Sequence, residues 1–412
     1  MKVTHTQAMP PPLAPPPTTL SAVAAALVAR GKGIAATDES PPTLGRRLEA
    51  AGVANTPEAR AAWRACLYGA DIGHFISGVI IFSEALHQTA PDGTPIPALL
   101  TRQGILVGVK ADLGLEPLTS PGAAPGETTT RGLEGLAARA AAWKAEGVSF
   151  VKWRAALRVG ACGAPPSAVA IAENAAQLAA YAVTAQAAGL VPVVEPEVLI
   201  DGAHGAPASA AAAEAVLRGV VAALVGAGAD LGGLLIKPTP VLPGADWAPP
   251  PPPPPGGWRR PAWEELAGLT LGALAAAVPP AVPGIVFLSG GLSEADATAC
   301  LDALNRARHA APEAERGAYP WALTFSFGRA LQASALAAWT AGVVRAGLPG
   351  PPDAVAAARA AFAGAAAANA AAAVGAFVGP HPAEGRQGSS LREDFRGWRG
   401  GDGAAGGGVK GG

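Results

Sequence analysis

Cysteine is scarce in this 412-residue chain, which holds only Cys66, Cys162 and Cys300. Their odd number and wide separation exclude a disulfide framework and a zinc site built from thiolates, and they indicate a reducing compartment. The six histidines are also scattered and show no ligand spacing, so the sequence predicts no metal site. These histidines are His5, His74, His87, His204, His309 and His381.

Charged side chains are few, at 15% of the residues, and the 30 Lys and Arg nearly cancel the 31 Asp and Glu to leave a net charge of −1. A nearly neutral chain gives no electrostatic reason to expect binding to nucleic acid or to an anionic membrane. No apolar run approaches about 18 residues without a charge, a glycine or a proline. We therefore expect no membrane span.

The first 20 residues lack both the apolar core of a secretory signal and the Arg- and Ser-rich character of a transit peptide. We interpret residues 1–20 as a disordered leader. The expected location is the cytoplasm, with a plastid form as the alternative.

Proline and glycine, in contrast, are abundant, with 41 and 53 copies. Seven consecutive prolines, Pro249–Pro255, lie within residues 247–263. Such a run favours polyproline II, and it either docks on a partner's aromatic groove or is a neutral loop insertion. The glycine-rich tail, residues 379–412, is expected to be mobile. Residues 21–378 remain as one domain that carries the proline-rich insertion.

Eight apolar segments, each short enough to be a buried strand, alternate with helical segments over roughly 300 residues. Eight strands that alternate with helices predict a (β/α)8 TIM barrel of the α/β class. The expected strands are Gly33–Asp38, Phe75–Phe82, Gly104–Lys110, Ser149–Arg154, Leu190–Glu195, Leu231–Lys237, Gly284–Ser289 and Ala322–Phe327. The expected helices include Thr56–Ala70, Pro166–Ala188, Ser293–Arg308 and Pro351–Ala376, and Thr56 and Ser293 have the character of N-caps.

Polar side chains gather at one end of these strands. In a TIM barrel the carboxyl ends of the strands face the active site, so a one-sided set of this kind predicts a functional site. The alternative is that charges merely mark where strands meet water. The residues are Asp38, Lys110, Lys152, Arg154, Glu195, Glu197, Lys237, Ser289 and Arg329.

Lys237 is the one charged residue in an apolar strand that Pro238 should end. Desolvation and neighbouring cations, here Lys110 and Lys152, both favour a neutral amine, and a neutral amine can attack a carbonyl to form a Schiff base. With Glu195 and Asp38 as acid/base groups on the same rim, such a site can form or break a C–C bond next to a carbonyl. The alternative is a lysine that extends from a strand end into water.

Glycines after the seventh and eighth strands predict a phosphate site. Leu288-Ser-Gly-Gly291 follows the seventh strand and Phe327-Gly-Arg329 follows the eighth. Loops at these two positions bind phosphate in many TIM barrels, because backbone N–H groups can approach the anion closely.

Several stretches of the chain resemble class I fructose-bisphosphate aldolases from Ala36-Thr-Asp-Glu-Ser40 to about Trp339. The resemblance implies a homotetrameric TIM-barrel lyase that needs no cofactor and binds sugar phosphates. It would cleave fructose 1,6-bisphosphate to dihydroxyacetone phosphate and glyceraldehyde 3-phosphate, in glycolysis, gluconeogenesis or carbon fixation. The matching stretches are Gly108-Val-Lys110, Gly126-Glu-Thr-Thr-Thr130, Lys152-Trp-Arg154, Val194-Glu-Pro-Glu197, Leu235-Ile-Lys-Pro238, Phe287-Leu-Ser-Gly-Gly291 and Pro320–Leu336.

The resemblance also implies roles for single residues. Lys237 would form the Schiff base, Glu195 would be the main general acid/base, and Asp38 would handle the proton of the C4 hydroxyl. Lys152 would assist the imine chemistry, and Glu197 would tune the lysines. The implied C1-phosphate ligands are Ser289, Gly290, Gly291, Gly328 and Arg329, and the implied C6-phosphate ligands are Lys110, Arg154 and Arg47.

Three features depart from the family pattern. The only tyrosines are Tyr68, Tyr181 and Tyr319, so the sequence has no tyrosine in its tail, where the family uses one for proton exchange. Leu113 stands where a basic residue is usual, and the proline run is foreign to the pattern. These departures leave open an alternative, an aldolase-like binding or scaffolding protein with weak or no catalysis.

Overall fold

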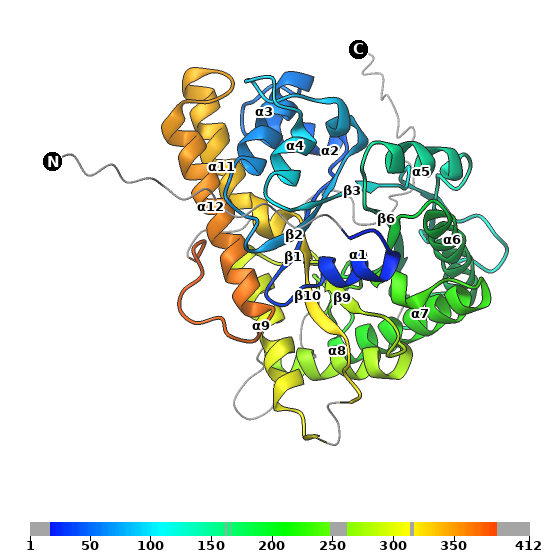
Figure 1. Ribbon diagram of the computed structural model, residues 1–412. Helices are drawn as coiled ribbons and strands as arrows, with labels where there is room; N and C mark the ends of the chain where they lie inside the picture. The colour runs from blue at the N-terminus through cyan, green and yellow to red at the C-terminus, as the bar shows by residue number, and fades with distance from the viewer. Residues whose placement is uncertain (1–16, 161–162, 165, 248–261, 314–316, 385–412) are drawn as a thin grey trace, which may run out of the picture.

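The computed structural model describes residues 17–160, 163–164, 166–247, 262–313 and 317–384, which Figure 1 draws in colour. The expectations for Pro249–Pro255, for most of the leader and for the tail beyond residue 384 fall outside these residues. The expected boundaries of the single domain stay a prediction.

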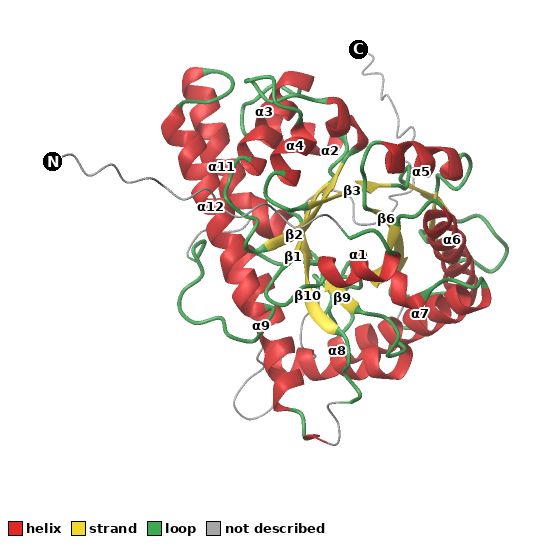
Figure 2. Cartoon of the chain, in the orientation of Figure 1, coloured by secondary structure: helices red, strands yellow, loops and turns green. Residues whose placement is uncertain are grey.

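Eight parallel strands form a closed barrel, in the order β1-β10-β9-β8-β7-β6-β3-β2, and helices surround it (Figures 1 and 2). This arrangement confirms the predicted (β/α)8 fold. The strands are β1 (Gly33–Thr37), β2 (Ile76–Ile81), β3 (Leu106–Lys110), β6 (Phe150–Arg158), β7 (Val191–Leu199), β8 (Leu235–Ile236), β9 (Gly284–Phe287) and β10 (Ala322–Phe327).

The strand before Lys237 is shorter than the sequence predicted. Only Leu235–Ile236 forms β8, because Leu231–Gly233 is a 3₁₀ turn, η3, in which the Asp230 carboxylate accepts a hydrogen bond from the N–H of Gly232. Lys237 nevertheless stays tied to β7, since its N–H donates to the carbonyl of Val194 at 2.7 Å.

Two strands were not predicted. They are β4 (Leu115–Pro117) and β5 (Thr128–Thr130), which pair antiparallel outside the barrel. The hairpin lies against β6, because the hydroxyls of Thr128 and Thr130 donate to the carbonyls of Ala156 and Arg154 at 3.0 and 2.8 Å.

The helices begin largely where the sequence placed them. Thr56 accepts a hydrogen bond from the N–H of Ala59 at 3.1 Å, and Ser293 accepts one from the N–H of Asp296 at 3.0 Å, so both predicted N-caps are confirmed. The helices are α1 (Leu20–Leu27), α2 (Pro41–Ala50), α3 (Pro57–Tyr68), α4 (Ile96–Thr101), α5 (Leu136–Ala145), α6 (Ala168–Ala187), α7 (Ala206–Gly226), α8 (Trp263–Ala277), α9 (Glu294–Ala310), α11 (Arg329–Ala346) and α12 (Pro352–Ala372), with a 3₁₀ helix η1 (Ser83–His87).

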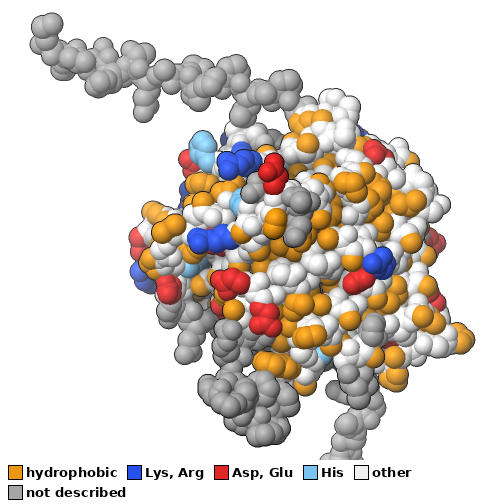
Figure 3. All heavy atoms as spheres, turned by 90° about the horizontal axis from the view of Figure 1, so that it is seen from below, with side chains coloured by type: hydrophobic (Ala, Val, Ile, Leu, Met, Phe, Trp, Pro, Cys, Tyr) orange, Lys and Arg blue, Asp and Glu red, His pale blue; other side chains and the backbone are white. Residues whose placement is uncertain are grey.

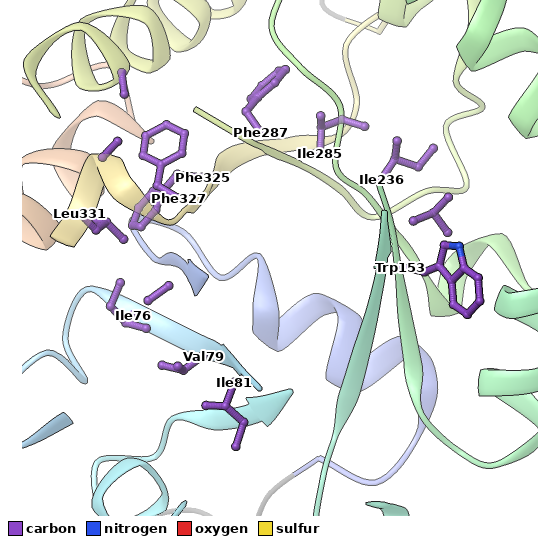
Figure 4. Close-up of a cluster of buried hydrophobic side chains, with 14 of the residues drawn as sticks. Ile76, Val79, Ile81, Trp153, Ile236, Ile285, Phe287, Phe325, Phe327 and Leu331 are labelled. Atoms are coloured by element: carbon purple, nitrogen blue, oxygen red, sulfur yellow. The ribbon is translucent and has the colours of Figure 1, made fainter. Parts of the chain in front are cut away.

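The alternation of side chains along the strands creates two apolar layers. One fills the barrel interior around Phe150, and α1 adds Val23 and Leu27 to it. The other lies between the strands and the outer helices. Figure 4 shows side chains of this outer layer pointing away from the barrel axis, among them Trp153, Phe287 and Phe325. Because α1 closes one end of the barrel with apolar side chains, the polar side chains of the site lie at the other end.

Two of the outer helices, α7 and α12, are long and apolar enough to cross a membrane by length and composition alone, with mean hydropathies of 1.6 and 1.2. Neither helix is an uninterrupted apolar run, because Glu214 and Arg218 lie within α7 and Asp353 and Arg359 lie within α12. Both helices pack within the outer layer, α7 against α6 and α8 and α12 against α11 and α9. In the view of Figure 3, the charged side chains of the described residues are scattered among apolar and uncharged atoms.

Glycine in β3 makes room for the aromatic ring at the centre of the barrel. A Cβ on Gly108 would lie 2.3 Å from a ring carbon of Phe150, and the fully buried ring has no free space to move into. We expect Gly108→Ala to lower the free energy of unfolding by about 1–3 kcal/mol, measured by urea denaturation. Gly268→Ala is the control, because a Cβ on this exposed residue of α8 meets nothing within 4 Å. It should leave stability unchanged or raise it by roughly 0.5–1 kcal/mol. Equal free energies of unfolding for Gly108→Ala and Gly268→Ala would contradict this account of the barrel interior.

Candidate active site

A buried carboxylate lies between two buried lysine side chains from neighbouring strands of the barrel. Glu195 of β7 places Oε1 3.0 Å from Nζ of Lys237 and Oε2 3.2 Å from Nζ of Lys152. The three residues are only 3–5% exposed. Lys152 belongs to β6, which pairs with β7 on one side, and Lys237 follows β8, which pairs with β7 on the other. The predicted meeting of these side chains is therefore present.

Asp38 joins this cluster from a strand that does not border it. The residue follows β1, and its Oδ2 lies 2.7 Å from Nζ of Lys152. Since β2 and β3 separate β1 from β6 around the barrel, the ion pair spans the barrel mouth. Lys152 thus links the two carboxylates.

The charges in the cluster stabilise one another. Burial alone would raise the pKa values of Asp38 and Glu195, but Lys152 and then Lys237 outweigh it and hold both below their usual range. Burial alone would lower the pKa of Lys152, but Asp38 and Glu195 raise it well above the usual lysine value. Both carboxylates and Lys152 are therefore ionised at neutral pH. Such a site can move protons between fixed partners without contact with bulk water.

Glu197 forms an ion pair with an arginine of the neighbouring strand. It was expected to tune the lysines, but the ion pair that the structure gives it joins its Oε2 to Nε of Arg154. Glu197 raises the pKa of Arg154 against the effect of burial, so the guanidinium is charged throughout.

The other two cations expected near the C6 phosphate also lie beside carboxylates. Lys110 pairs with the carboxylate of Asp112 and donates to the Asp112 carbonyl at 2.7 Å. Arg47, on α2, donates to Glu39 at 2.7 Å. Lys110 lies level with Lys152 on the adjacent strand, but it does not join the pair around Glu195 in the described structure.

The glycine-containing loops lie side by side, because β9 and β10 are paired. Gly290 and Gly291 have positive φ values of 57° and 87°, which suit glycine and curve the backbone after Ser289. Gly328 precedes α11, and Arg329 is the first residue of that 18-residue helix. A helix N-terminus together with a guanidinium favours an anion, so this part of the site suits a phosphate.

Sequence reasoning missed two carboxylates that fix site cations, Asp112 and Glu39. Asp112 is 5% exposed, and its carboxylate also accepts from the N–H of Gly114 at 3.2 Å. Its place two residues after Lys110 was an available signal. Within the described residues, no group of three or more His, Cys, Asp or Glu side chains is placed to hold a metal ion.

The family model for class I fructose-bisphosphate aldolases matches residues 19–395. The chain belongs to the class I fructose-bisphosphate aldolase family. It is 46% identical to rat fructose-bisphosphate aldolase C over 322 residues, 78% of this chain and 82% of the relative. It is 44% identical to the Drosophila melanogaster fructose-bisphosphate aldolase over the same shares of the two chains.

A solved aldolase structure supports the same assignment. Fructose-bisphosphate aldolase from Plasmodium falciparum, in complex with TRAP and a small-molecule inhibitor, superposes with a TM-score of 0.78 at 37% identity. The alignment covers 89% of this chain and 99% of the relative. The resemblance found in the sequence is therefore confirmed, and the protein is an aldolase of this class.

The ionised cluster predicts how this aldolase responds to the loss of Lys152. In Lys152→Met, Asp38 and Glu195 would lose their shared cation, and leaving buried charges uncompensated typically costs about 3–5 kcal/mol. We expect a loss of that size in urea unfolding at pH 7. Lys144→Met is the control, because the exposed Lys144 ammonium donates only to the Gly189 carbonyl at 2.8 Å.

The same variant should change the pH dependence of stability. In the wild type both carboxyl pKa values lie below their ordinary values of 3.8 and 4.5. Their stabilising effect is therefore complete above those values and is lost as the pH falls through the folded-state values. Without Lys152 the two carboxyls should take up protons at higher pH than in the wild type. The difference in free energy of unfolding between the wild type and Lys152→Met should therefore narrow as the pH falls below about 4.5. A gap that stays constant from pH 7 to pH 3 would contradict the charge assignment.

Proposed function

We propose that the protein cleaves fructose 1,6-bisphosphate reversibly to dihydroxyacetone phosphate and glyceraldehyde 3-phosphate through a Schiff base on Lys237. The observation that carries this proposal is the position of Glu195, whose two oxygens lie 3.0 Å and 3.2 Å from Nζ of Lys237 and of Lys152. A carboxylate within hydrogen-bond distance of a lysine can take its proton and leave a nucleophilic amine.

The proton transfers follow from that geometry. Glu195 takes a proton from the Lys237 ammonium, and the amine attacks C2 of the ketose to form a carbinolamine. Glu195 then returns a proton to the C2 oxygen, which leaves as water, and a protonated imine remains. Lys152 stabilises Glu195 in its ionised form between these steps.

Cleavage then needs a base at the C4 hydroxyl, and Asp38 fits this role. As Asp38 accepts the hydroxyl proton, the C3–C4 bond breaks and its electron pair moves into the imine, which gives an enamine and the free aldehyde. Protonation of the enamine at C3 and hydrolysis of the imine release dihydroxyacetone phosphate. The low pKa of Asp38 keeps the carboxylate ready to accept.

The two phosphates would bind at opposite sides of the mouth. The C1 phosphate fits the N-terminus of α11 with Arg329, together with the backbone of Ser289, Gly290, Gly291 and Gly328. The C6 phosphate would meet Lys110, Arg154 and Arg47. All three cations lie beside carboxylates, so the C6 side offers less net positive charge than the count of its basic residues suggests.

We also propose a cytoplasmic homotetramer that acts in glycolysis, gluconeogenesis or carbon fixation, with a plastid form as the alternative. Two buried free cysteines, Cys66 and Cys300, support a reducing compartment. The Plasmodium aldolase, which was solved in complex with TRAP, keeps a binding or scaffolding role open as a second function. An assay of fructose 1,6-bisphosphate cleavage separates that role from catalysis.

Borohydride reduction tests the Schiff base directly. With dihydroxyacetone phosphate present, borohydride should attach the triose to Lys237, identified by peptide mass spectrometry. Lys237→Met should abolish both labelling and cleavage, whereas Lys144→Met should retain both. EDTA should leave the rate unchanged, because the mechanism needs no metal. Labelling at another lysine, or strong inhibition by EDTA, would overturn the assignment.

Substitutions at the two phosphate sites should separate the substrates. Arg329→Ala removes a charge-assisted contact worth about 1.5–3 kcal/mol, so it should raise KM for fructose 1,6-bisphosphate and for fructose 1-phosphate by roughly 10–150-fold. Lys110→Ala should impair only the bisphosphate, since fructose 1-phosphate has no C6 phosphate. Steady-state kinetics on both ketoses make the comparison. Equal losses on the two substrates in Lys110→Ala would place Lys110 elsewhere.

A further inference from the structure

The last residue of β1 is anchored by a buried pair of hydroxyls. The Thr37 hydroxyl donates to the carbonyl of Ile80 in β2 at 2.9 Å, and it lies 2.6 Å from the hydroxyl of Tyr68. Since the Thr37 hydrogen is used by Ile80, Tyr68 must be the donor in the second bond. Tyr68 is fully buried at the end of α3, and burial raises its pKa to about 12, so it remains a donor at every working pH.

The other side of the same strand end is anchored from α11. Gln332 is 1% exposed, and its Nε2 donates to the carbonyl of Ala36 at 3.0 Å and to Glu39 at 3.3 Å. Gln332 lies one helical turn after Arg329, so this contact joins the end of β1 to the helix that begins the C1-phosphate site.

Between these anchors lies Asp38, the first residue beyond the strand. The next helix, α2, begins at Pro41, and its N-cap Ser40 makes no capping bond with its side chain. The position of Asp38 is therefore set by the anchored strand before it and by Glu39 after it, which accepts from Gln332 and Arg47. We propose that Tyr68 and Gln332 are positioning residues that fix the Asp38 carboxylate for its proton transfer.

This inference rests on the proposed function, in which Asp38 accepts the C4 hydroxyl proton. The carboxylate is strongly attracted to Lys152 across the barrel mouth, at 2.7 Å. If the end of β1 were free to move, Asp38 could follow Lys152 and still remain paired, but its oxygens would leave the place that the C4 hydroxyl needs. Proton transfer requires a heavy-atom distance of about 2.6–3.2 Å, so a shift of about 1 Å is enough to slow it.

Tyr68→Phe is the sharpest test, because it removes one hydroxyl and keeps the ring. We expect kcat for fructose 1,6-bisphosphate cleavage to fall by about 10–100-fold, with KM changed by less than about 3-fold. Exchange of the C3 proton of dihydroxyacetone phosphate and borohydride trapping at Lys237 should stay near wild type, because both require the Schiff base that Lys237 and Glu195 form and neither requires a base at a C4 hydroxyl. Tyr319→Phe is the control, and it should keep the wild-type kcat.

A second variant, Thr37→Val, keeps the side-chain shape but removes the hydroxyl that accepts from Tyr68 and donates to Ile80. If Tyr68→Phe does not fold, Thr37→Val should show the same pattern, slower cleavage with proton exchange and trapping near wild type. Gln332→Leu, which removes the contact from α11, should also slow cleavage and leave proton exchange and borohydride trapping near wild type. Combining Tyr68→Phe with Asp38→Asn should cause no further loss beyond Asp38→Asn alone, because the tyrosine acts through that carboxylate. Circular dichroism and urea unfolding establish that each variant is folded.

Several outcomes would overturn the positioning role. Folded Tyr68→Phe and Thr37→Val with wild-type kcat would show that the anchor is not needed. An equal loss of cleavage and of proton exchange, or additive losses with Asp38→Asn, would show a general structural effect. Failure of the wild-type protein to be trapped at Lys237 would instead overturn the proposed function, so the two failures are distinguishable.

Discussion

The site depends on one buried carboxylate that two ammonium groups share. Without Glu195, Lys152 and Lys237 would be like charges in a place of low dielectric, and without the lysines Glu195 would be an unpaired buried anion. Lys152 lies within β6, Glu195 within β7 and Lys237 directly after β8, and these three strands are neighbours. A parallel barrel provides this geometry, because the carboxyl ends of all its strands meet on one face.

The apolar barrel interior, the Lys152–Asp38 ion pair and the phosphate loops together determine where that cluster lies and what surrounds it. The barrel interior is filled by Phe150 and its neighbours, and α1 packs against them at one end, so the polar cluster can lie only at the other. The pairing of Lys152 with Asp38 ties the β6–β8 side of the mouth to β1. The phosphate loops after β9 and β10 lie between β8 and β1 in the barrel order. The anion site is therefore next to Lys237, which follows β8, and to Asp38, which follows β1.

Much of this could be predicted from sequence, because buried parallel strands are apolar, short and ended by polar residues. All eight strands and the residues of the Glu195 cluster were located in this way, although β6 and β7 continue to Arg158 and Leu199, beyond the predicted ends at Arg154 and Glu195. The strand before Lys237 was predicted too long because Leu231–Gly233 is as apolar as a strand, and only the carboxylate of Asp230 favours a turn there. The β4–β5 hairpin was missed because its strands have three residues each, too few to show alternation.

Ion-pair partners were the least predictable feature. Arg154 lies opposite Glu195 in the strand register, yet its guanidinium reaches Glu197, two residues further along β7. Only the register and the side-chain directions decide between the two carboxylates, and neither is visible in the sequence. The same holds for Tyr68 and Thr37, which are 31 residues apart in the sequence and whose hydroxyls meet only in the folded chain.

The central claim is that Glu195 moves protons for Lys237, and the single-turnover rate of Glu195→Gln tests it most directly. Glutamine keeps the size and hydrogen-bonding ability of the side chain but cannot accept the lysine proton. Rapid-quench measurement of fructose 1,6-bisphosphate cleavage with enzyme in excess should show a rate about 10²–10⁴-fold below that of the wild type. A folded Glu195→Gln enzyme that cleaves within about 3-fold of the wild-type rate would contradict the account.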